Sequence, residues 1–157
     1  MKITILAVGK TDDTNIANLV DTYIKRLQHY INFELIIIPD LKKTKNLSID
    51  QQKTEEGKLI LAKLETSDFV TLLDERGKKY TSLKFAALIN KRSVSGLKRL
   101  VFVIGGPYGF STEVYKRAND KLSLSDMTFS HQMVRLFAVE QIYRAFTILK
   151  NEPYHHE

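Results

Sequence analysis

Short apolar runs alternate along the chain with longer segments in which apolar residues recur every three or four positions. The short runs, rich in isoleucine and valine, predict strands at 2–8, 33–38, 69–73, 100–104 and 121–125. The periodic segments predict helices at 12–30, 48–64, 81–91, 111–117 and 131–150. Residues 41–46 are basic and polar, and we expect a mobile loop there. The alternation predicts one α/β domain over 1–157, with a mostly parallel sheet and helices on both faces.

Three predicted strand ends are candidates for a ligand site, because parallel α/β sheets bind ligands outside the carboxyl ends of their strands. They are residues 73–77, 105–109 and 125–129. Gly105 and Gly106 would let the backbone approach a ligand closely, although an ordinary turn explains both glycines equally well. The small polar and apolar residues at 122–129 would suit an adenine edge, or a strand followed by a helix capped by Thr128 or Ser130.

Neither glycine-containing turn matches a nucleotide-binding motif. A P-loop ending at residues 8–11 would need a glycine five residues before Gly9, where the chain has Thr4. The glycines of 105–109 are at the first, second and fifth positions, whereas a dinucleotide motif has them at the first, third and sixth. The sequence also contains no complete nucleophile or metal constellation, which disfavours an α/β enzyme acting on small molecules.

The composition limits the classes of protein to which this chain can belong and the kinds of partner that it can bind. The 157 residues, 43% of them hydrophobic, suffice for one domain with a core. The absence of cysteine excludes disulfides and thiolate metal sites, and the four histidines lack zinc-ligand spacing. No apolar run is long enough to span a membrane and no cleavage site follows the apolar start, so we expect a cytoplasmic protein without a metal. The net charge of +6 favours a polyanionic partner.

The last predicted helix and the tail after it carry the remaining candidate chemistry. Glu140 and Arg144 are four residues apart and can form an ion pair on one helix face. The helix is more apolar than one small sheet requires, which a dimer interface would explain. The tail at 151–157 places Tyr154 beside His155 and His156, and such a group can stack on a base and move a proton.

Taken together, these residues resemble one family, the SPOUT-class large-subunit ribosomal RNA methyltransferases of type H. The likeness covers essentially the whole chain, and its motifs are specific in combination. It is carried, in the same order and spacing, by residues 1–10, 101–106, 122–129, 143–145 and 153–155.

The resemblance implies a C-terminal trefoil knot, a homodimer, and S-adenosylmethionine bound mostly through backbone groups. It implies methylation of N(3) of pseudouridine 1915 in 23S ribosomal RNA within the assembled ribosome. The cofactor-binding residues implied are Leu73, Gly105, Leu124, Ser125, Asp126, Met127, Thr128 and Phe129. These residues lie at the three strand ends that the sheet rule selects.

For catalysis, we expect His155 to act as a base or orienting group and Tyr154 to stack on the target. Arg144 or Arg135 would stabilise negative charge on the flanking carbonyl oxygens, and the tail would serve its own site or that of a partner. The family tail commonly reads Tyr-His-Arg or Tyr-His-Lys, and His156 replaces that constant cation with a titratable ring. The alternative function is a non-catalytic ribosome-binding or RNA-binding module on the same scaffold.

Overall fold

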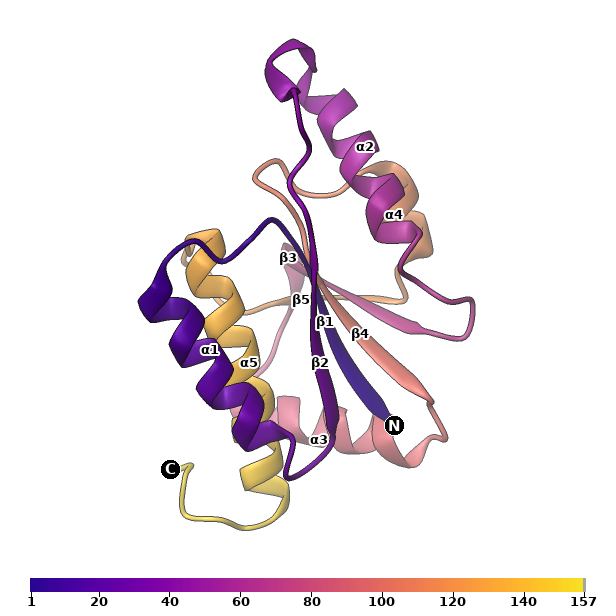
Figure 1. Ribbon diagram of the computed structural model, residues 1–157. Coiled ribbons are helices and arrows are strands. Elements are labelled where there is room, and N and C mark those ends of the chain that lie inside the picture. Colours follow the sequence, from indigo (N-terminus) through magenta and orange to yellow (C-terminus); the bar gives the residue numbers. More distant parts are fainter. Residues whose placement is uncertain (157) are drawn as a thin grey trace.

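The computed structural model describes residues 1–156, in which five strands form one sheet. The strands are β1 (Lys2–Val8), β2 (Asn32–Ile38), β3 (Phe69–Lys79), β4 (Arg99–Ile104) and β5 (Asp120–Ser123). Their order is β2-β1-β4-β3-β5, and every hydrogen-bonded pair of neighbours is parallel (Figure 1). The predicted α/β class with a parallel sheet is therefore confirmed.

Four α-helices connect the strands and a fifth follows the last strand, and each begins after a side chain that caps it. They are α1 (Thr14–Leu27), α2 (Ile49–Leu61), α3 (Ser82–Val94), α4 (Thr112–Arg117) and α5 (His131–Leu149). The capping oxygens, which accept hydrogen bonds from backbone N–H groups of the first turns, belong to Asp13, Ser48, Thr81, Ser111 and Ser130. The cap left open between Thr128 and Ser130 is thus Ser130.

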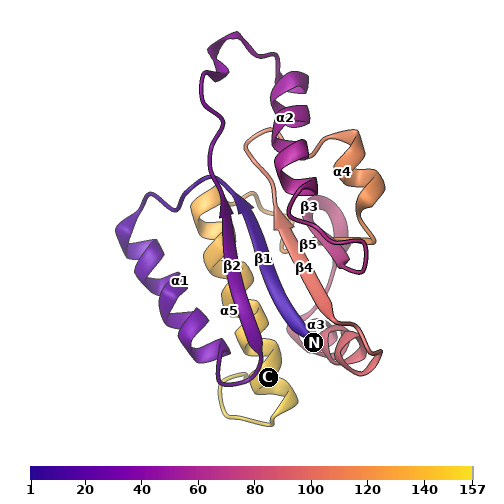
Figure 2. The ribbon, with the colours of Figure 1, turned by 45° about the vertical axis from the view of Figure 1, so that its right-hand side comes forward.

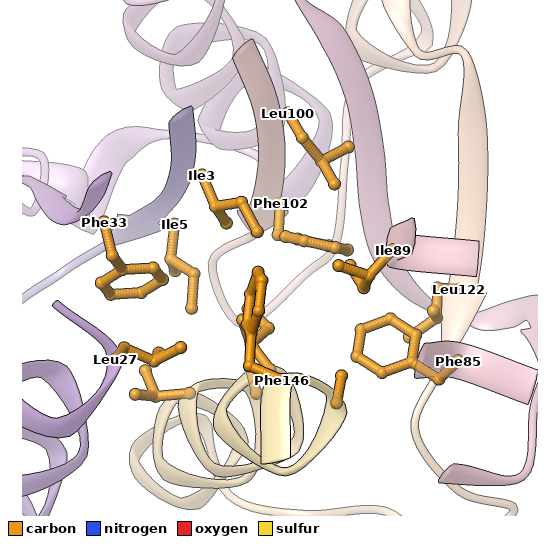
Figure 3. Packing of buried hydrophobic residues seen from close by; sticks show 14 of the residues in the cluster. Ile3, Ile5, Leu27, Phe33, Phe85, Ile89, Leu100, Phe102, Leu122 and Phe146 are labelled. Carbon is orange, nitrogen blue, oxygen red and sulfur yellow. The ribbon is translucent and has the colours of Figure 1, made fainter. Parts of the chain in front are cut away.

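The helices cover both faces of the sheet, as the sequence predicts (Figure 2). Successive strand residues point to opposite faces, so Ile3 and Ile5 of β1 face α1, α3 and α5, whereas Leu6 and Val8 face α2 and α4. Figure 3 shows the first of these two cores, where Phe146 of α5 points toward the sheet. Strands buried on both faces explain the nearly continuous apolar runs in the sequence.

The ends of three predicted helices differ from the structure by three residues, and two predicted strands and one predicted loop also differ. The third strand continues beyond residue 73 to Lys79. The fifth strand ends at Ser123, two residues earlier than expected, so Leu124 and Ser125 lie outside it. The expected loop at 41–46 contains a short 3-10 helix, Thr44–Asn46, immediately before the capping residue of α2.

Helix α5 runs the length of the strands, from the side of the sheet where their carboxyl ends lie (the carboxyl edge) to the side where their amino ends lie (the amino edge). It begins near the carboxyl ends of the strands and runs to their amino ends, about 27 Å away (Figure 1). Although α5 is the longest helix, no helix within residues 1–156 is long and apolar enough to cross a membrane. The trefoil knot implied for this end of the chain stays a prediction.

Candidate functional site

A bulge in β3 forms the first part of a hollow at the carboxyl edge of the sheet. Leu73 and Lys78 both lie opposite Leu122 of β5, so the residues between them leave the regular pairing. Gly77 makes this close approach possible, because a Cβ atom there would lie 2.4 Å from the backbone of Leu122. The charged residues 74–76, which resemble a loop in sequence, therefore sit inside a strand and line this edge.

A tight glycine turn after β4 forms the second part. The N–H of Gly109 donates to the carbonyl of Gly106 at 3.2 Å, and Gly109 adopts a φ of 82°. A Cβ atom on Gly105 would lie 2.9 Å from the Phe110 ring, and one on Gly106 would lie 2.4 Å from the buried carboxylate of Glu56. Any side chain at 105 or 106 would displace these neighbours, and the two glycines line the hollow with backbone atoms alone.

The segment after β5 forms the third part. The Ser123 hydroxyl donates to the carbonyl of Ser125 at 3.0 Å, and the Ser125 hydroxyl accepts from the N–H of Met127 at 3.0 Å. The Phe129 ring packs on Phe137 of α5 with 4.7 Å between ring centroids. The segment is therefore held by its own short-range hydrogen bonds, by one ring contact and by an ion pair between Asp126 and Lys79 of β3, while Met127 is 77% exposed.

These three parts enclose two adjoining hollows of about 190 Å³ and 420 Å³. The smaller is lined by residues 122–129, and the larger by the glycine turn. Both share Leu73, Asp74, Glu75, Phe129 and Val134. The structure thus brings together all eight residues predicted to bind the cofactor, and the larger hollow alone reaches the size of a small-molecule site, about 300–1,000 Å³.

The wall shared by the two hollows is acidic. The Tyr115 hydroxyl of α4 donates to the carboxylate of Asp74, and Lys79 forms an ion pair with Asp126. Burial, and then the hydrogen bond to Asp74, raise the pKa of Tyr115 to about 12. Asp74 and Glu75 therefore present negative charge to both hollows, which suits a cationic ligand in the smaller one, whereas Lys53 and Arg76 add positive charge to the larger one.

A second set of polar side chains lies at the opposite edge, where the chain turns back after α5. The N–H of Asn151 donates to the carbonyl of Ile148 and that of Glu152 to the carbonyl of Thr147, and Asn151 adopts a φ of 55°. These two bonds and the left-handed residue form a Schellman motif. The motif fixes the direction in which residues 152–156 leave the helix.

The turn brings Tyr154 and His155 onto Arg144 of α5. Arg144 donates through Nη2 to Oε1 of Glu140 at 2.6 Å, and the Tyr154 hydroxyl donates to the same oxygen at 3.0 Å. The guanidinium lies 4.7 Å from the centroid of the Tyr154 ring, and its Nη1 contacts Nδ1 of His155 at 3.3 Å. We call Tyr23, Glu140, Arg144, Tyr154 and His155 the tail cluster.

The tail cluster is partly buried, and its groups tune one another. Burial raises the pKa of Tyr154, and hydrogen bonds to Tyr23 and Glu140 raise it further. The hydrogen bond to Glu140 raises the pKa of Arg144, so this cation stays charged. A guanidinium only donates hydrogen bonds, so Nδ1 of His155 is the acceptor in its contact with Arg144.

Two members of the tail cluster were not among the predicted catalytic residues. Glu140 was recognised only as the helical partner of Arg144, a pairing that the structure confirms. Tyr23 was recognised only as an apolar position of the first helix, yet its hydroxyl lies 3.2 Å from that of Tyr154. Nothing in the sequence links two tyrosines 131 positions apart.

Arg135 lies away from the tail cluster. It is 2% exposed and donates to the carbonyl of Val8 at 2.8 Å and to the Thr11 hydroxyl at 2.9 Å. Burial lowers its pKa. It lies nine positions before Arg144, about 13 Å along the helix. The structure therefore gives Arg135 the task of tying the end of β1 to α5.

The hollows and the tail cluster do not form one site within one chain, because they lie at opposite edges of the sheet. In the part of the chain that the structure describes, no group of three or more His, Asp or Glu side chains is arranged to hold a metal ion.

The whole chain is similar to known methyltransferases. The family model described as "Predicted SPOUT methyltransferase" matches residues 1–155. A protein of Christiangramia forsetii named "Ribosomal RNA large subunit methyltransferase H" is 65% identical over 156 residues, 99% of both chains, and one of Flavobacterium johnsoniae with the same name is 59% identical over the full length of both. A solved structure, "a probable methylase family protein from Haemophilus influenzae Rd KW20", shares the fold with a TM-score of 0.56 at 12% identity, over 99% of this chain and 70% of that one.

Proposed function

Because this chain belongs to the SPOUT methyltransferase family, we propose that it methylates N(3) of pseudouridine 1915 in 23S ribosomal RNA, within the assembled ribosome in the cytoplasm. The names of its relatives support ribosomal RNA as the substrate. The observation that carries the proposal is the pair of hollows that gathers Leu73, Gly105 and residues 124–129.

S-adenosylmethionine fits the chemistry of these hollows. The glycine turn and the segment 124–129 offer backbone groups to an adenine edge, and Leu124 and Phe129 offer apolar surface to its ring. Asp74 and Glu75 offer negative charge to a sulfonium and an ammonium group. When bound, the cofactor supplies an electrophilic methyl group, and the residues of the hollow hold it in one orientation.

The methyl transfer forms an N–CH₃ bond, breaks the S–CH₃ bond and requires N(3) to lose its proton. The tail cluster is suited to assist at the base. Arg144 would stabilise the negative charge that develops on the carbonyl oxygens beside N(3), and the Tyr154 ring would stack on the base. His155 would orient the base, or accept its proton, after exchanging its contact with Arg144.

A homodimer would bring the two regions together. Within one chain, the length of α5 separates the hollow from the tail. The tail of one protomer would therefore complete the hollow of its partner. The half-buried apolar residues of α5, such as Val134 and Leu136, provide surface for such an interface.

The test uses ribosomes from a strain that lacks this protein. Incubation with the purified protein and labelled S-adenosylmethionine should label 23S RNA, and mass spectrometry should place the methyl group on N(3) of pseudouridine 1915. Unlabelled RNA, or a methyl group at another position, would contradict the proposal. Calorimetry addresses the alternative of a non-catalytic RNA-binding module, because such a module should release no heat with S-adenosylmethionine.

A further inference from the structure

The segment that leads into α2 projects from the body of the protein. In Figures 1 and 2 it extends beyond the carboxyl edge of the sheet, the edge that holds the hollows. Only the second half of α2 is anchored, since its buried residues are Glu56, Gly57 and Ile60. Residues 41–53, which we call the basic arm, are exposed or half-buried throughout.

The arm carries an excess of positive charge that the protein itself leaves unpaired. Lys42, Lys43 and Lys45 are exposed, and within residues 1–156 none of them forms an ion pair. Asp40, the acid just before the arm, is turned toward the body, where its carboxylate lies against Gly9 and faces Arg135. Three lysines within four residues thus present their charge to an external partner.

The tip of the arm has a defined conformation. Lys43 adopts a φ of 60°, a left-handed conformation that is unfavourable for a residue with a side chain. The 3-10 turn Thr44–Asn46 and the capping box between Ser48 and Gln51 follow directly. A left-handed lysine between ordered elements indicates that the backbone carrying these lysines has a defined course.

One residue links the arm to the methyl-donor site. Lys53, one turn into α2, lines the larger hollow together with the glycine turn. A strand of RNA with a base in the hollow would therefore continue along Lys53 toward the tip of the arm. Repeated phosphates match these lysines in charge, and such contacts do not depend on base sequence.

We infer that the basic arm binds the phosphate backbone of the RNA that carries the target base, on the same protomer that holds the methyl donor. The inference rests on the proposed function and adds a docking surface to it. Lys42, Lys43 and Lys45 act as substrate-binding residues, and they contribute to ribosome affinity without contacting the cofactor.

The test compares two triple variants that remove the same charge. Lys42→Gln, Lys43→Gln and Lys45→Gln together neutralise the arm, whereas Lys84→Gln, Lys91→Gln and Lys98→Gln neutralise exposed lysines of α3 and the loop after it. The dissociation constant for unmethylated ribosomes is measured against salt concentration. The arm variant should bind on the order of 50-fold more weakly at about 0.15 M salt, with a log–log slope shallower by roughly 2 to 3. The dissociation constant of the control variant should stay within about threefold of the wild-type value.

Kinetics and cofactor binding separate this inference from the proposed function. The KM for ribosomes should rise in the arm variant while kcat is unchanged, and both variants should bind S-adenosylmethionine as the wild type does. Equal losses in the two variants, or an unchanged salt slope in the arm variant, would overturn the inference. If the wild-type protein transferred no methyl group to ribosomes, the proposed function would fail, whereas the arm is judged by binding alone.

Discussion

The hollow at the carboxyl edge and the tail cluster at the amino edge differ in which part of the chain forms them. Backbone shapes the hollow, because Gly77, Gly105 and Gly106 allow approaches that a Cβ atom would block. Side chains shape the tail cluster, where one carboxylate oxygen of Glu140 accepts hydrogen bonds from both Arg144 and Tyr154. The first region is therefore sensitive to added atoms, and the second to lost charges and hydroxyl groups.

The contrast matches two different tasks. A hollow of rigid backbone can hold one cofactor in one orientation, and its shape does not depend on protonation. A charged cluster can respond to a substrate, since its groups can exchange hydrogen bonds when a base arrives. Changes in the hollow should therefore appear first in cofactor affinity, whereas changes in the tail should appear in the rate of methyl transfer with cofactor affinity intact.

Removal of residues 153–157 is the most severe test of this division. The truncated chain keeps the Schellman motif and loses Tyr154 and His155. We expect methyl transfer to ribosomes to fall by about 100- to 10,000-fold, the range for loss of groups that position or move a proton. Single-turnover kinetics measures the rate, and calorimetry with S-adenosylmethionine should give an unchanged dissociation constant.

Arg144→Lys provides a full-length control, because it keeps the charge and loses the two-pronged geometry of the guanidinium. Its rate should lie between those of the wild type and the truncated chain. If the truncated chain lost cofactor affinity as well, the two regions would not be separate in function. A mixture of truncated protein with a hollow-deficient variant should regain activity if the tail acts across a dimer.

Gly106→Ala tests the hollow. The new Cβ atom would lie 2.4 Å from the carboxylate of Glu56, which is 4% exposed and enclosed by the fold. Overpacking of this kind costs about 1–3 kcal/mol of folding free energy, and the shift of the turn that relieves it should weaken the binding of S-adenosylmethionine. Calorimetry measures the affinity, and thermal unfolding checks that the chain folds.

Glu56→Ala in the Gly106→Ala background is the matched partner, since it removes the group that the new methyl meets. The double variant should recover most of the lost affinity, which additive effects of two independent changes would not produce. If the double variant bound more weakly than either single variant, the contact between residues 56 and 106 would not be the cause.

The two regions also differ in how far they can be predicted from sequence. Residues 124–129 and Gly105 follow from the rule on strand ends together with the resemblance, and both lie in the hollow. The bulge cannot be predicted because charged residues beside Gly77 are typical of a loop, and only their pairing with β5 in the folded protein makes them part of a strand. The contact of Tyr23 with Tyr154 escapes it because only the tertiary fold brings α1 beside the tail.

Asn151→Ala sharpens the comparison at the base of the tail. Asn151 adopts a left-handed φ of 55°, which asparagine tolerates better than alanine does. The free energy of unfolding should fall by about 1 kcal/mol, measured by urea denaturation. Asn151→Gly, the matched variant, should unfold at or above the wild-type urea concentration. An equal loss in both variants would point to the asparagine side chain as the stabilising element.

The smallest expected effect concerns a feature that both regions share, a tyrosine hydroxyl that donates to a carboxylate. In the hollow this is Tyr115 with Asp74, and in the tail Tyr154 with Glu140. The pKa of Tyr115 is raised to about 12 in the folded protein, against about 10 in an unfolded chain. Between these two pKa values the folded state binds more protons than the unfolded chain, so the free energy of unfolding falls as the pH rises. Below pH 10 the stabilisation from the protonated Tyr115 hydroxyl is fully present.

Tyr115→Phe removes this contribution and keeps the ring that packs on Phe110. The variant should unfold at a lower urea concentration than the wild type at pH 8, by the worth of about one hydrogen bond, 0.5–1.5 kcal/mol. The difference in unfolding free energy between the wild type and the variant should decrease from pH 10 upward. The decrease should be smaller than the 1.4 kcal/mol per pH unit expected when one full proton is released, because the ring is partly solvated. Tyr108→Phe, which removes an exposed hydroxyl from the same edge, should follow the wild-type curve. If this difference in unfolding free energy stayed constant to pH 11.5, the hydrogen bond to Asp74 would not hold the proton on Tyr115. The negative charge of Asp74 would then affect a bound ligand but not Tyr115.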